Sequence, residues 1–164
     1  MTTPAILDVT CAGRHMWNDK NHPLALYVDQ RQEPPGTIPI RPNWCIRPQV
    51  VASFTALPFA SDSFRMVIFD PPHIIRTRRS KGFLRTKYGE LGADWREVLR
   101  AGFDECWRVL QPGGTLIFKW SGKTITAATV LALFSAAPLF KCRHDVSWWI
   151  FMKPPTVERP PRGC

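Results

Sequence analysis

The sequence predicts an α/β domain built on one mostly parallel sheet. The first observation is a series of short apolar runs that each end in polar or small residues, as buried parallel strands do. These runs lie at residues 5–9, 24–29, 50–54, 66–69 and 115–120. The second is an amphipathic helix at 94–110, with apolar residues three and four apart. The third is an apolar pair at 139–144 and 147–153, which predicts an antiparallel hairpin. A short helix is expected within 15–23 and a longer one at 124–137.

Length and composition indicate one domain and a polyanionic partner. The chain has 164 residues, 45% of them hydrophobic, which suits a domain at 1–153 followed by a loose proline- and arginine-rich tail at 154–164. The formal net charge of +9 favours nucleic acid as a partner, with solubility alone as the alternative explanation.

The sequence also bears on the compartment. No apolar run approaches the roughly 20 residues of a membrane span, and no secretory leader is expected. The five cysteines are scattered without metal-ligand spacing, so we expect reduced thiols, no metal and a cytoplasmic location.

The most informative stretch is the apolar run 66–69 with the four residues that follow it. The strand stops at Asp70 because Pro71 and Pro72 cannot continue a ladder and restrain the backbone. The Asp70 carboxylate and the Pro71 carbonyl are thus expected just past a strand's carboxyl end, where open α/β sheets bind ligands. Two such acceptors suit the two N–H donors of an exocyclic amino group, and His73 adds a flat ring that could stack on a base. A strand-ending turn whose acid caps a helix is the alternative.

Asp70-Pro71-Pro72-His73 resembles the Asp-Pro-Pro-Tyr motif of the amino-methyltransferases. Those enzymes methylate an exocyclic nitrogen of adenine or cytosine from S-adenosylmethionine, and His73 stands where they usually carry Tyr, Phe or Trp. The stretch WRVLQPGGTLIFKW is similar to the helix, Pro-Gly-Gly and strand of the same proteins. The resemblance covers about 5–153 and implies a Rossmann-like seven-strand methyltransferase domain with helices on both faces of the sheet. It also implies that residues 70–73 form the catalytic motif.

The resemblance also implies a cofactor site. An acid at the end of the first strand, a loop of small residues after it, and a second acid about 20 residues further on suit S-adenosylmethionine, with Asp29 accepting from the ribose hydroxyls. Ser53, Phe54 and Leu57 fall where the family holds the adenine. The implied cofactor residues are Asp8, Thr10, Cys11, Ala12, Gly13, Asp29, Ser53, Phe54 and Leu57. For Asp29 the alternative is a turn aspartate, and for the first loop an ordinary turn.

Two segments carry positive charge. Residues 76–87 hold six cations and no acid beside the catalytic turn, so we interpret them as a phosphate-gripping lid, with a solvated loop as the alternative. These cations are Arg76, Arg78, Arg79, Lys81, Arg85 and Lys87. Residues 30–49 contain five prolines and no predicted helix. There, basic side chains and Trp44 either contact nucleic acid or form a surface loop with the tryptophan tucked into the core.

The predicted function is therefore methyl transfer from S-adenosylmethionine to a nucleic-acid base, with adenine N6 in DNA favoured. An RNA amino-methyltransferase, a small-molecule methyltransferase and a nucleic-acid-binding protein of the same fold without catalysis are the alternatives. The small size resembles stand-alone methyltransferases of bacteriophages and mobile elements, which implies a bacterial cell or phage-infected host.

Overall fold

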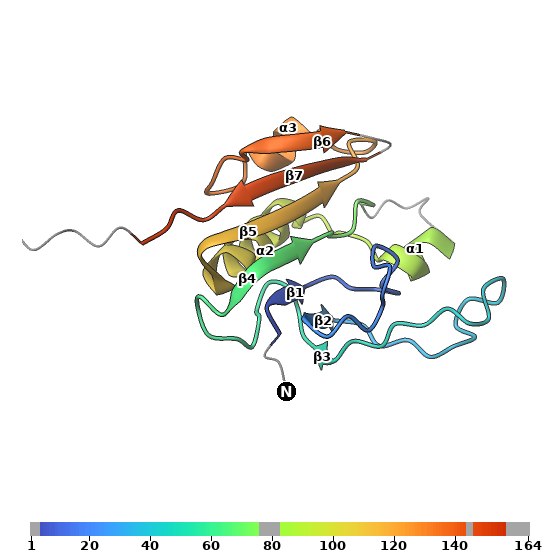
Figure 1. Ribbon diagram of the computed structural model, residues 1–164. Helices are drawn as coiled ribbons and strands as arrows, with labels where there is room; N and C mark the ends of the chain where they lie inside the picture. Colours follow the sequence, from blue (N-terminus) through green and yellow to red (C-terminus); the bar gives the residue numbers. More distant parts are fainter. Residues whose placement is uncertain (1–3, 76–82, 144–145, 157–164) are drawn as a thin grey trace, which may run out of the picture.

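The computed structural model describes residues 4–75, 83–143 and 146–156 (Figure 1). Within them, one seven-stranded sheet has the order β3-β2-β1-β4-β5-β7-β6. The strands are β1 (Ile6–Asp8), β2 (Ala25–Asp29), β3 (Val50–Val51), β4 (Phe64–Phe69), β5 (Leu110–Trp120), β6 (Phe140–Arg143) and β7 (Ser147–Met152). The helices are α1 (Phe83–Tyr88), α2 (Trp95–Val109) and α3 (Ala127–Leu131).

The strand directions match the predicted topology. Strands β3, β2, β1, β4 and β5 pair in parallel, whereas β7 is antiparallel to both β5 and β6. This confirms the predicted fold class, a Rossmann-like α/β domain of seven strands with a mostly parallel sheet and a C-terminal antiparallel hairpin. The part of the chain that the structure describes contains no helix long and apolar enough to cross a membrane.

The register of the central strands places the candidate catalytic residue. Phe69 on β4 pairs with Phe118 on β5, so the next residues, Asp70 and Lys119, lie side by side at the carboxyl edge of the sheet. Asp8 at the end of β1 is paired with Ile68 on one side and with Tyr27 on the other. The carboxyl ends of β1, β2, β4 and β5 therefore meet at one edge.

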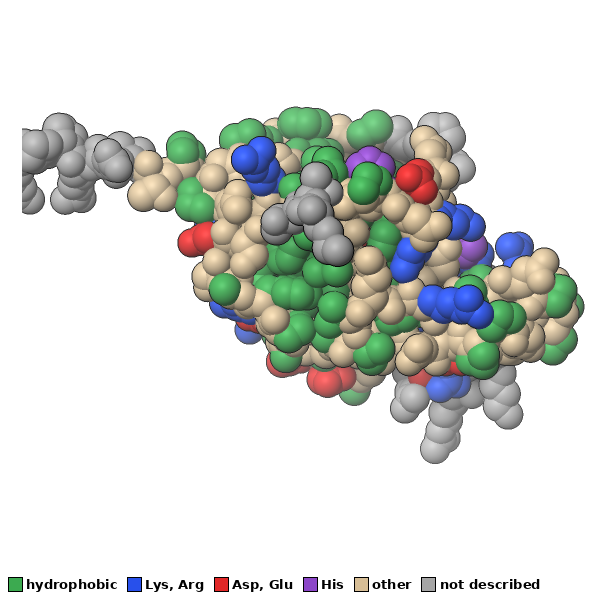
Figure 2. Space-filling view, turned by 60° about the horizontal axis from the view of Figure 1, so that its bottom comes forward, with side chains coloured by type: hydrophobic (Ala, Val, Ile, Leu, Met, Phe, Trp, Pro, Cys, Tyr) green, Lys and Arg blue, Asp and Glu red, His purple; other side chains and the backbone are tan. Residues whose placement is uncertain are grey.

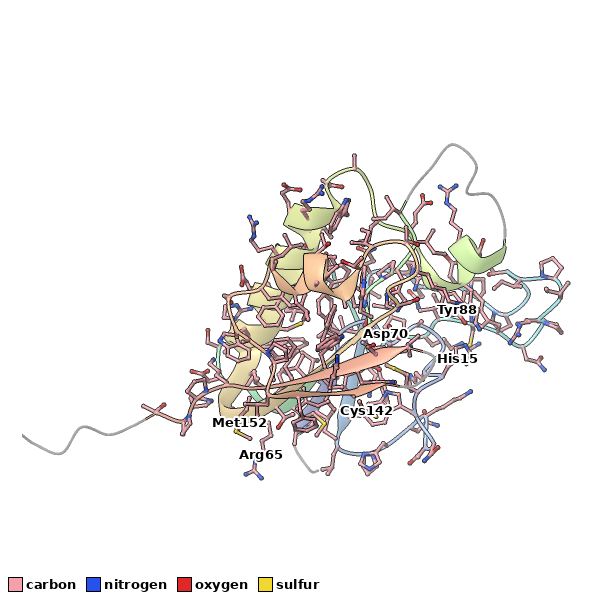
Figure 3. All side chains as sticks on the ribbon, turned by 90° about the horizontal axis from the view of Figure 1, so that it is seen from above. His15, Arg65, Asp70, Tyr88, Cys142 and Met152 are labelled. Atoms are coloured by element: carbon pink, nitrogen blue, oxygen red, sulfur yellow. The ribbon has the colours of Figure 1, made fainter. Side chains whose placement is uncertain are left out.

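The main core lies between the sheet and α2. This helix turns its apolar stripe toward the sheet, and Leu99, Phe103 and Cys106 are fully buried. Phe103 stacks on Phe134 with ring centroids 4.1 Å apart, which joins the segment after α3 to the same core. Figure 3 shows α2 and α3 on the same face of the sheet.

The expectation of helices on both faces is therefore not met within the described residues. The segment 15–23, expected to be helical, forms turns, because Ala12 and Arg14 have positive φ and Trp17 is drawn back toward β1 by a hydrogen bond to Asp8. The helix expected at 124–137 is shorter, since after α3 the backbone tightens and Phe134 turns in to the core. Strand β5 begins directly after α2, five residues earlier than 115, and its Leu110 pairs with Phe64.

The proline-rich segment 30–49 contains a small core of its own. Glu33 and Ile46 form an isolated antiparallel bridge, and Trp44 is buried against Ile38 and Ile46. The interpretation of a surface loop with its tryptophan tucked inside thus holds for Trp44 itself.

Gly102 packs directly against two aromatic rings, because a Cβ there would lie 2.5 Å from Phe54 Cδ2 and 2.9 Å from Phe69 Cζ. Gly102→Ala should therefore lower the free energy of unfolding by about 1–3 kcal/mol, the cost of overpacking. An exposed helical Gly→Ala change would instead gain roughly 1 kcal/mol. Urea denaturation measures the difference, with Arg100→Ala on the exposed face as the control. A stabilised Gly102→Ala protein would contradict this packing.

Candidate active site

A cavity of about 500 Å³ opens at the carboxyl edge of the sheet. It is formed mainly by the segments that follow β1, β2, β3, β4 and β5, together with Tyr88 of α1. The predicted site residues that line it are Thr10, Cys11, Ala12, Asp29, Phe54, Asp70, Pro71, Pro72 and His73. The candidate catalytic turn and most of the candidate cofactor loop therefore share one cavity, of a size typical of small-molecule sites.

Asp70 is held from three sides. Its backbone N–H donates to Thr10 Oγ1 over 2.9 Å, which fixes the turn to the loop after β1. Its Oδ2 accepts from Lys119 Nζ over 2.7 Å, and His73 Nε2 lies 3.1 Å from its Oδ1. The carboxylate is about one-fifth exposed, so it faces the cavity while its orientation is fixed. Each carboxylate oxygen still has a lone-pair direction available for a donor from a ligand.

His73 is turned inward toward the sheet. Its ring meets Trp120 edge to face, with centroids 4.9 Å apart, and Figure 3 places its neighbour Asp70 at the sheet edge. Its Nδ1 is buried and has no hydrogen-bond partner among the described residues. The prediction that His73 offers a stacking face to a base is thus not supported by this conformation, in which the imidazole instead contacts Asp70.

Asp29 has the most crowded carboxylate of the site. Oδ2 accepts from the Ala12 N–H over 3.0 Å, and Oδ1 accepts from the Arg31 N–H over 2.9 Å. The Arg31 guanidinium adds bonds of 3.1 and 3.2 Å to the two oxygens. It also reaches the Thr86 and Lys87 carbonyls of α1, each at 3.4 Å. For Asp29 to accept from a ligand hydroxyl, Arg31 has to give up part of this contact.

Four of the predicted cofactor residues lie off the cavity wall. Asp8 is fully buried, and its two oxygens accept from the Thr10 N–H and the Trp17 indole N–H. Leu57 belongs to the main core, and Ser53 Oγ bonds Thr55 in a local turn. Gly13 faces a second cavity. Asp8 therefore holds the loop through Thr10 and Trp17 and does not line the cavity.

The positive segment 76–87 is described only in part. Arg76, Arg78, Arg79 and Lys81 lie outside the described residues. Arg85 pairs with Glu90, and Lys87 is 8% exposed and donates to the Tyr88 hydroxyl over 2.7 Å. Lys87 is therefore buried at α1 and not presented to solvent as a phosphate contact, whereas Arg85 stays partly exposed while it pairs with Glu90.

Sequence reasoning missed Lys119, Arg31 and Lys123 as cavity residues. Lys119 could have been found, since it stands at the end of a predicted strand beside the strand that precedes Asp70. Arg31 gave a weaker signal, as one of several arginines around the proline-rich segment. The described residues include no cluster of His, Cys, Asp or Glu able to hold a metal ion.

Two buried groups near the cavity have shifted pKa values. Burial raises the pKa of Asp8 to about 7, against the opposing effect of its hydrogen bonds from Trp17 and Thr10. Burial likewise raises the pKa of the Cys11 thiol to about 12, so Cys11 is a neutral part of the wall and not a thiolate nucleophile.

Comparison with known proteins adds little at the level of sequence. No protein-family profile matches the chain, and no curated protein matches it. Among solved structures, the crystal structure of the antibiotic-resistance methyltransferase Kmr is similar, with 16% sequence identity and a TM-score of 0.44. The alignment covers 90% of this chain and 86% of that chain. A similarity this low assigns no activity, so the function has to be argued from the site.

The Asp8 carboxyl makes stability depend on pH. Its pKa is higher in the folded chain than the ordinary 3.8, so the folded state holds the proton more tightly. Stability should therefore fall as pH rises from about 4 to about 7 and level off above that. Thermal melting between about pH 5 and pH 8 should show wild type losing stability relative to Asp8→Asn. The same change at the exposed Asp94 is the control, and parallel curves for Asp8→Asn and wild type would contradict the assignment.

Proposed function

We propose that this protein transfers a methyl group from S-adenosylmethionine to an exocyclic amino nitrogen of a nucleic-acid base. The observation that carries the proposal is that the Asp70 turn, residues 10–12 and Asp29 line the same cavity. An acceptor for an amino group and a loop suited to a nucleoside ligand thereby lie within reach of one small molecule.

The residues of the cavity fit S-adenosylmethionine, which supplies an electrophilic methyl group when bound. Phe54 offers an apolar wall for an adenine, and Asp29 offers oxygens for ribose hydroxyls once Arg31 has moved. Lys123 offers a cation for the carboxylate of the cofactor. The backbone N–H groups of Thr10 and Ala12 are already bonded to Asp8 and Asp29, so the loop is held in shape before any ligand enters.

Asp70 is placed to act on the amino group. Its carboxylate and the Pro71 carbonyl would accept the two N–H bonds, which aligns the nitrogen lone pair with the methyl carbon. As the nitrogen gains the methyl group it loses one N–H proton, which Asp70 is placed to accept. Lys119 keeps the carboxylate turned toward β5, and His73 holds its other oxygen.

A nucleic-acid substrate is supported by the charge of the chain and by the chemistry of the motif. The net charge of +9 favours association with a phosphate backbone. A base in a duplex must be flipped out to reach Asp70, at a cost of a few kcal/mol. Adenine N6 in DNA is the first substrate to test. RNA uses the same chemistry and is the second, so both belong in one assay with nucleoside analysis of the products.

Cofactor binding tests the role of Asp29 and its competition with Arg31. Asp29→Ala should weaken S-adenosylmethionine binding by roughly 1.5–3 kcal/mol, the range for hydrogen bonds to a charged group. Arg31→Ala should leave binding intact or tighter, since it frees the Asp29 oxygens. Titration calorimetry measures both, with Arg65→Ala as the charge control. Wild-type affinity in Asp29→Ala would remove this carboxylate from the site, and no binding in wild type would favour the non-enzymatic alternative.

Methyl transfer tests Asp70. Asp70→Ala should lower the rate on the order of a thousandfold, because positioning and charge stabilisation are lost together. Asp70→Asn keeps one acceptor oxygen and should retain partial activity. The measurement is labelled methyl incorporation into DNA and RNA at saturating cofactor.

The control for this experiment is thermal melting, since loss of Asp70 also leaves Lys119 without its carboxylate. Lys119→Met with Asp70→Ala removes both charges and separates a folding defect from a catalytic one. A folded Asp70→Ala protein with the wild-type rate would overturn the proposed function.

A further inference from the structure

A second cavity, of about 650 Å³, lies beside the candidate active site. Its walls are two segments where crossover helices are absent, 12–21 and 41–47. It shares Ala12 and His15 with the first cavity, so the loop after β1 separates the two. Figure 2 shows Lys and Arg side chains, in blue, at the right-hand end of the molecule, where Figure 1 places the segments that follow β1 and β2.

The walls of this second cavity are positively charged. Arg14, Lys20, Arg41 and Arg47 line it together with Asn21 and Asn43, and no Asp or Glu is among its lining residues. This charge contributes to a lowered pKa at His15. Its pKa is lowered first by burial and then by the cations Lys87, Lys20, Arg41 and Lys119.

Arg14 holds the two wall segments of the cavity together through its hydrogen bonds. Its guanidinium donates to the Lys20 carbonyl over 2.6 Å and to the Arg47 carbonyl over 2.7 Å, and it lies over the Tyr27 ring. The two segments are thereby clamped together through their backbones. The Lys20 and Arg47 side chains are exposed, and within the described part of the chain neither has a hydrogen-bond or ion-pair partner.

A buried donor without a partner points to the same place. Trp44 is 6% exposed, and its indole N–H has no acceptor among the described residues. This nitrogen and His15 Nε2 both crowd Gly13, where a Cβ would lie 3.3 Å from the first and 2.8 Å from the second. Burying an N–H group without an acceptor is unfavourable, and an acceptor from a ligand would remove that cost.

We propose that this cavity, which we name the basic cavity, binds a phosphate group. Guanidinium, ammonium and amide donors surround it, and these groups are the usual partners of phosphate oxygens. The absence of acids from its walls disfavours a cationic ligand, and the number of cations exceeds what a single carboxylate needs. Two sources carry the same group, the backbone of a nucleic acid and a free nucleotide.

The test removes charge from the basic cavity without removing its frame. Lys20→Ala with Arg47→Ala keeps the clamp, because Arg14 holds the backbone carbonyls of these residues and not their side chains. The matched control is Arg65→Ala with Arg100→Ala, which removes the same charge from exposed positions that do not line the cavity. Figure 3 shows Arg65 far from His15.

Binding is measured without S-adenosylmethionine, so the result does not depend on methyl transfer. Fluorescence anisotropy follows fluorescein-labelled single-stranded DNA and RNA oligonucleotides over a range of salt, and calorimetry follows ATP and inorganic phosphate. If the backbone is the source, the cavity variant should bind oligonucleotides about tenfold or more weakly than the control. Its salt slope should be flatter by about 1.4, for two lost contacts to a single strand. If a free nucleotide is the source, the loss should be confined to ATP.

The indole N–H gives an independent readout. Trp44→Phe keeps the ring in its apolar cluster and removes the donor, so phosphate affinity should fall several-fold while the melting temperature changes little. Trp149→Phe is the matched control, since its indole N–H is also buried without a partner among the described residues but does not line the basic cavity.

Two results would overturn the proposal. One is a cavity variant that binds oligonucleotides and ATP no more weakly than the control variant. The other is a wild-type protein that binds none of the four probes. Either result leaves the role of Asp70 standing, because methyl transfer is measured separately. An inactive Asp70 site, conversely, leaves phosphate binding untouched.

Discussion

The contacts of Asp70 tie three strand ends together. The residue ends β4, its N–H is bonded to Thr10 after β1, and its carboxylate is bonded to Lys119 on β5. Because β4 and β5 pair up to Phe69 and Phe118, the acid and the lysine meet without any loop having to position them. A rigid sheet edge thus sets the geometry of the candidate catalytic group, which is the arrangement that precise positioning needs.

Two further acids shape the loop that faces Asp70. Asp8 accepts from the Thr10 N–H, and Asp29 accepts from the Ala12 N–H. Ala12 and Arg14 both have positive φ, a conformation that costs about 1–2 kcal/mol outside glycine. The hydrogen bonds from the loop to Asp8 and Asp29 offset part of that cost and hold the loop in this shape. The fully buried Asp8 is thereby explained as a structural residue.

The sheet edge could be predicted from the sequence because its signals are local. Apolar runs that end in an acid predicted the strands, and the two prolines after Asp70 predicted the turn that ends β4. Phe54 reached the cavity as expected. Ser53 and Leu57 did not, because the Ser53 hydroxyl bonds Thr55 within a local turn and Leu57 packs into the main core. The role of Asp8 depends on the hydrogen bond from the Trp17 indole, which lies beyond the turns after β1. The spacing of residues in the sequence does not predict that contact.

The missing helices follow from side-chain contacts over long sequence distances. Segment 15–23 has room for two helical turns, yet Arg14 bonds the backbone of Lys20 and Arg47 instead, and the clamp opposes a helix. Segment 30–49 was correctly expected to lack a helix, since proline acts on its own neighbours. Segments 12–21 and 41–47 together enclose the second cavity. The sequence does not predict this cavity, because it depends on how two distant segments pack against each other.

The two cavities are physically linked by the loop between them. Ala12 and His15 belong to both walls, and Asp29 fixes Ala12 from the side of the first cavity. Arg31 extends this chain of contacts from Asp29 to the carbonyls of α1. A ligand that draws Arg31 away from Asp29 would therefore change its contacts with α1 while Asp29 keeps its bond to Ala12. Since the same loop walls the basic cavity, a ligand in either cavity acts on the backbone that the other one contacts.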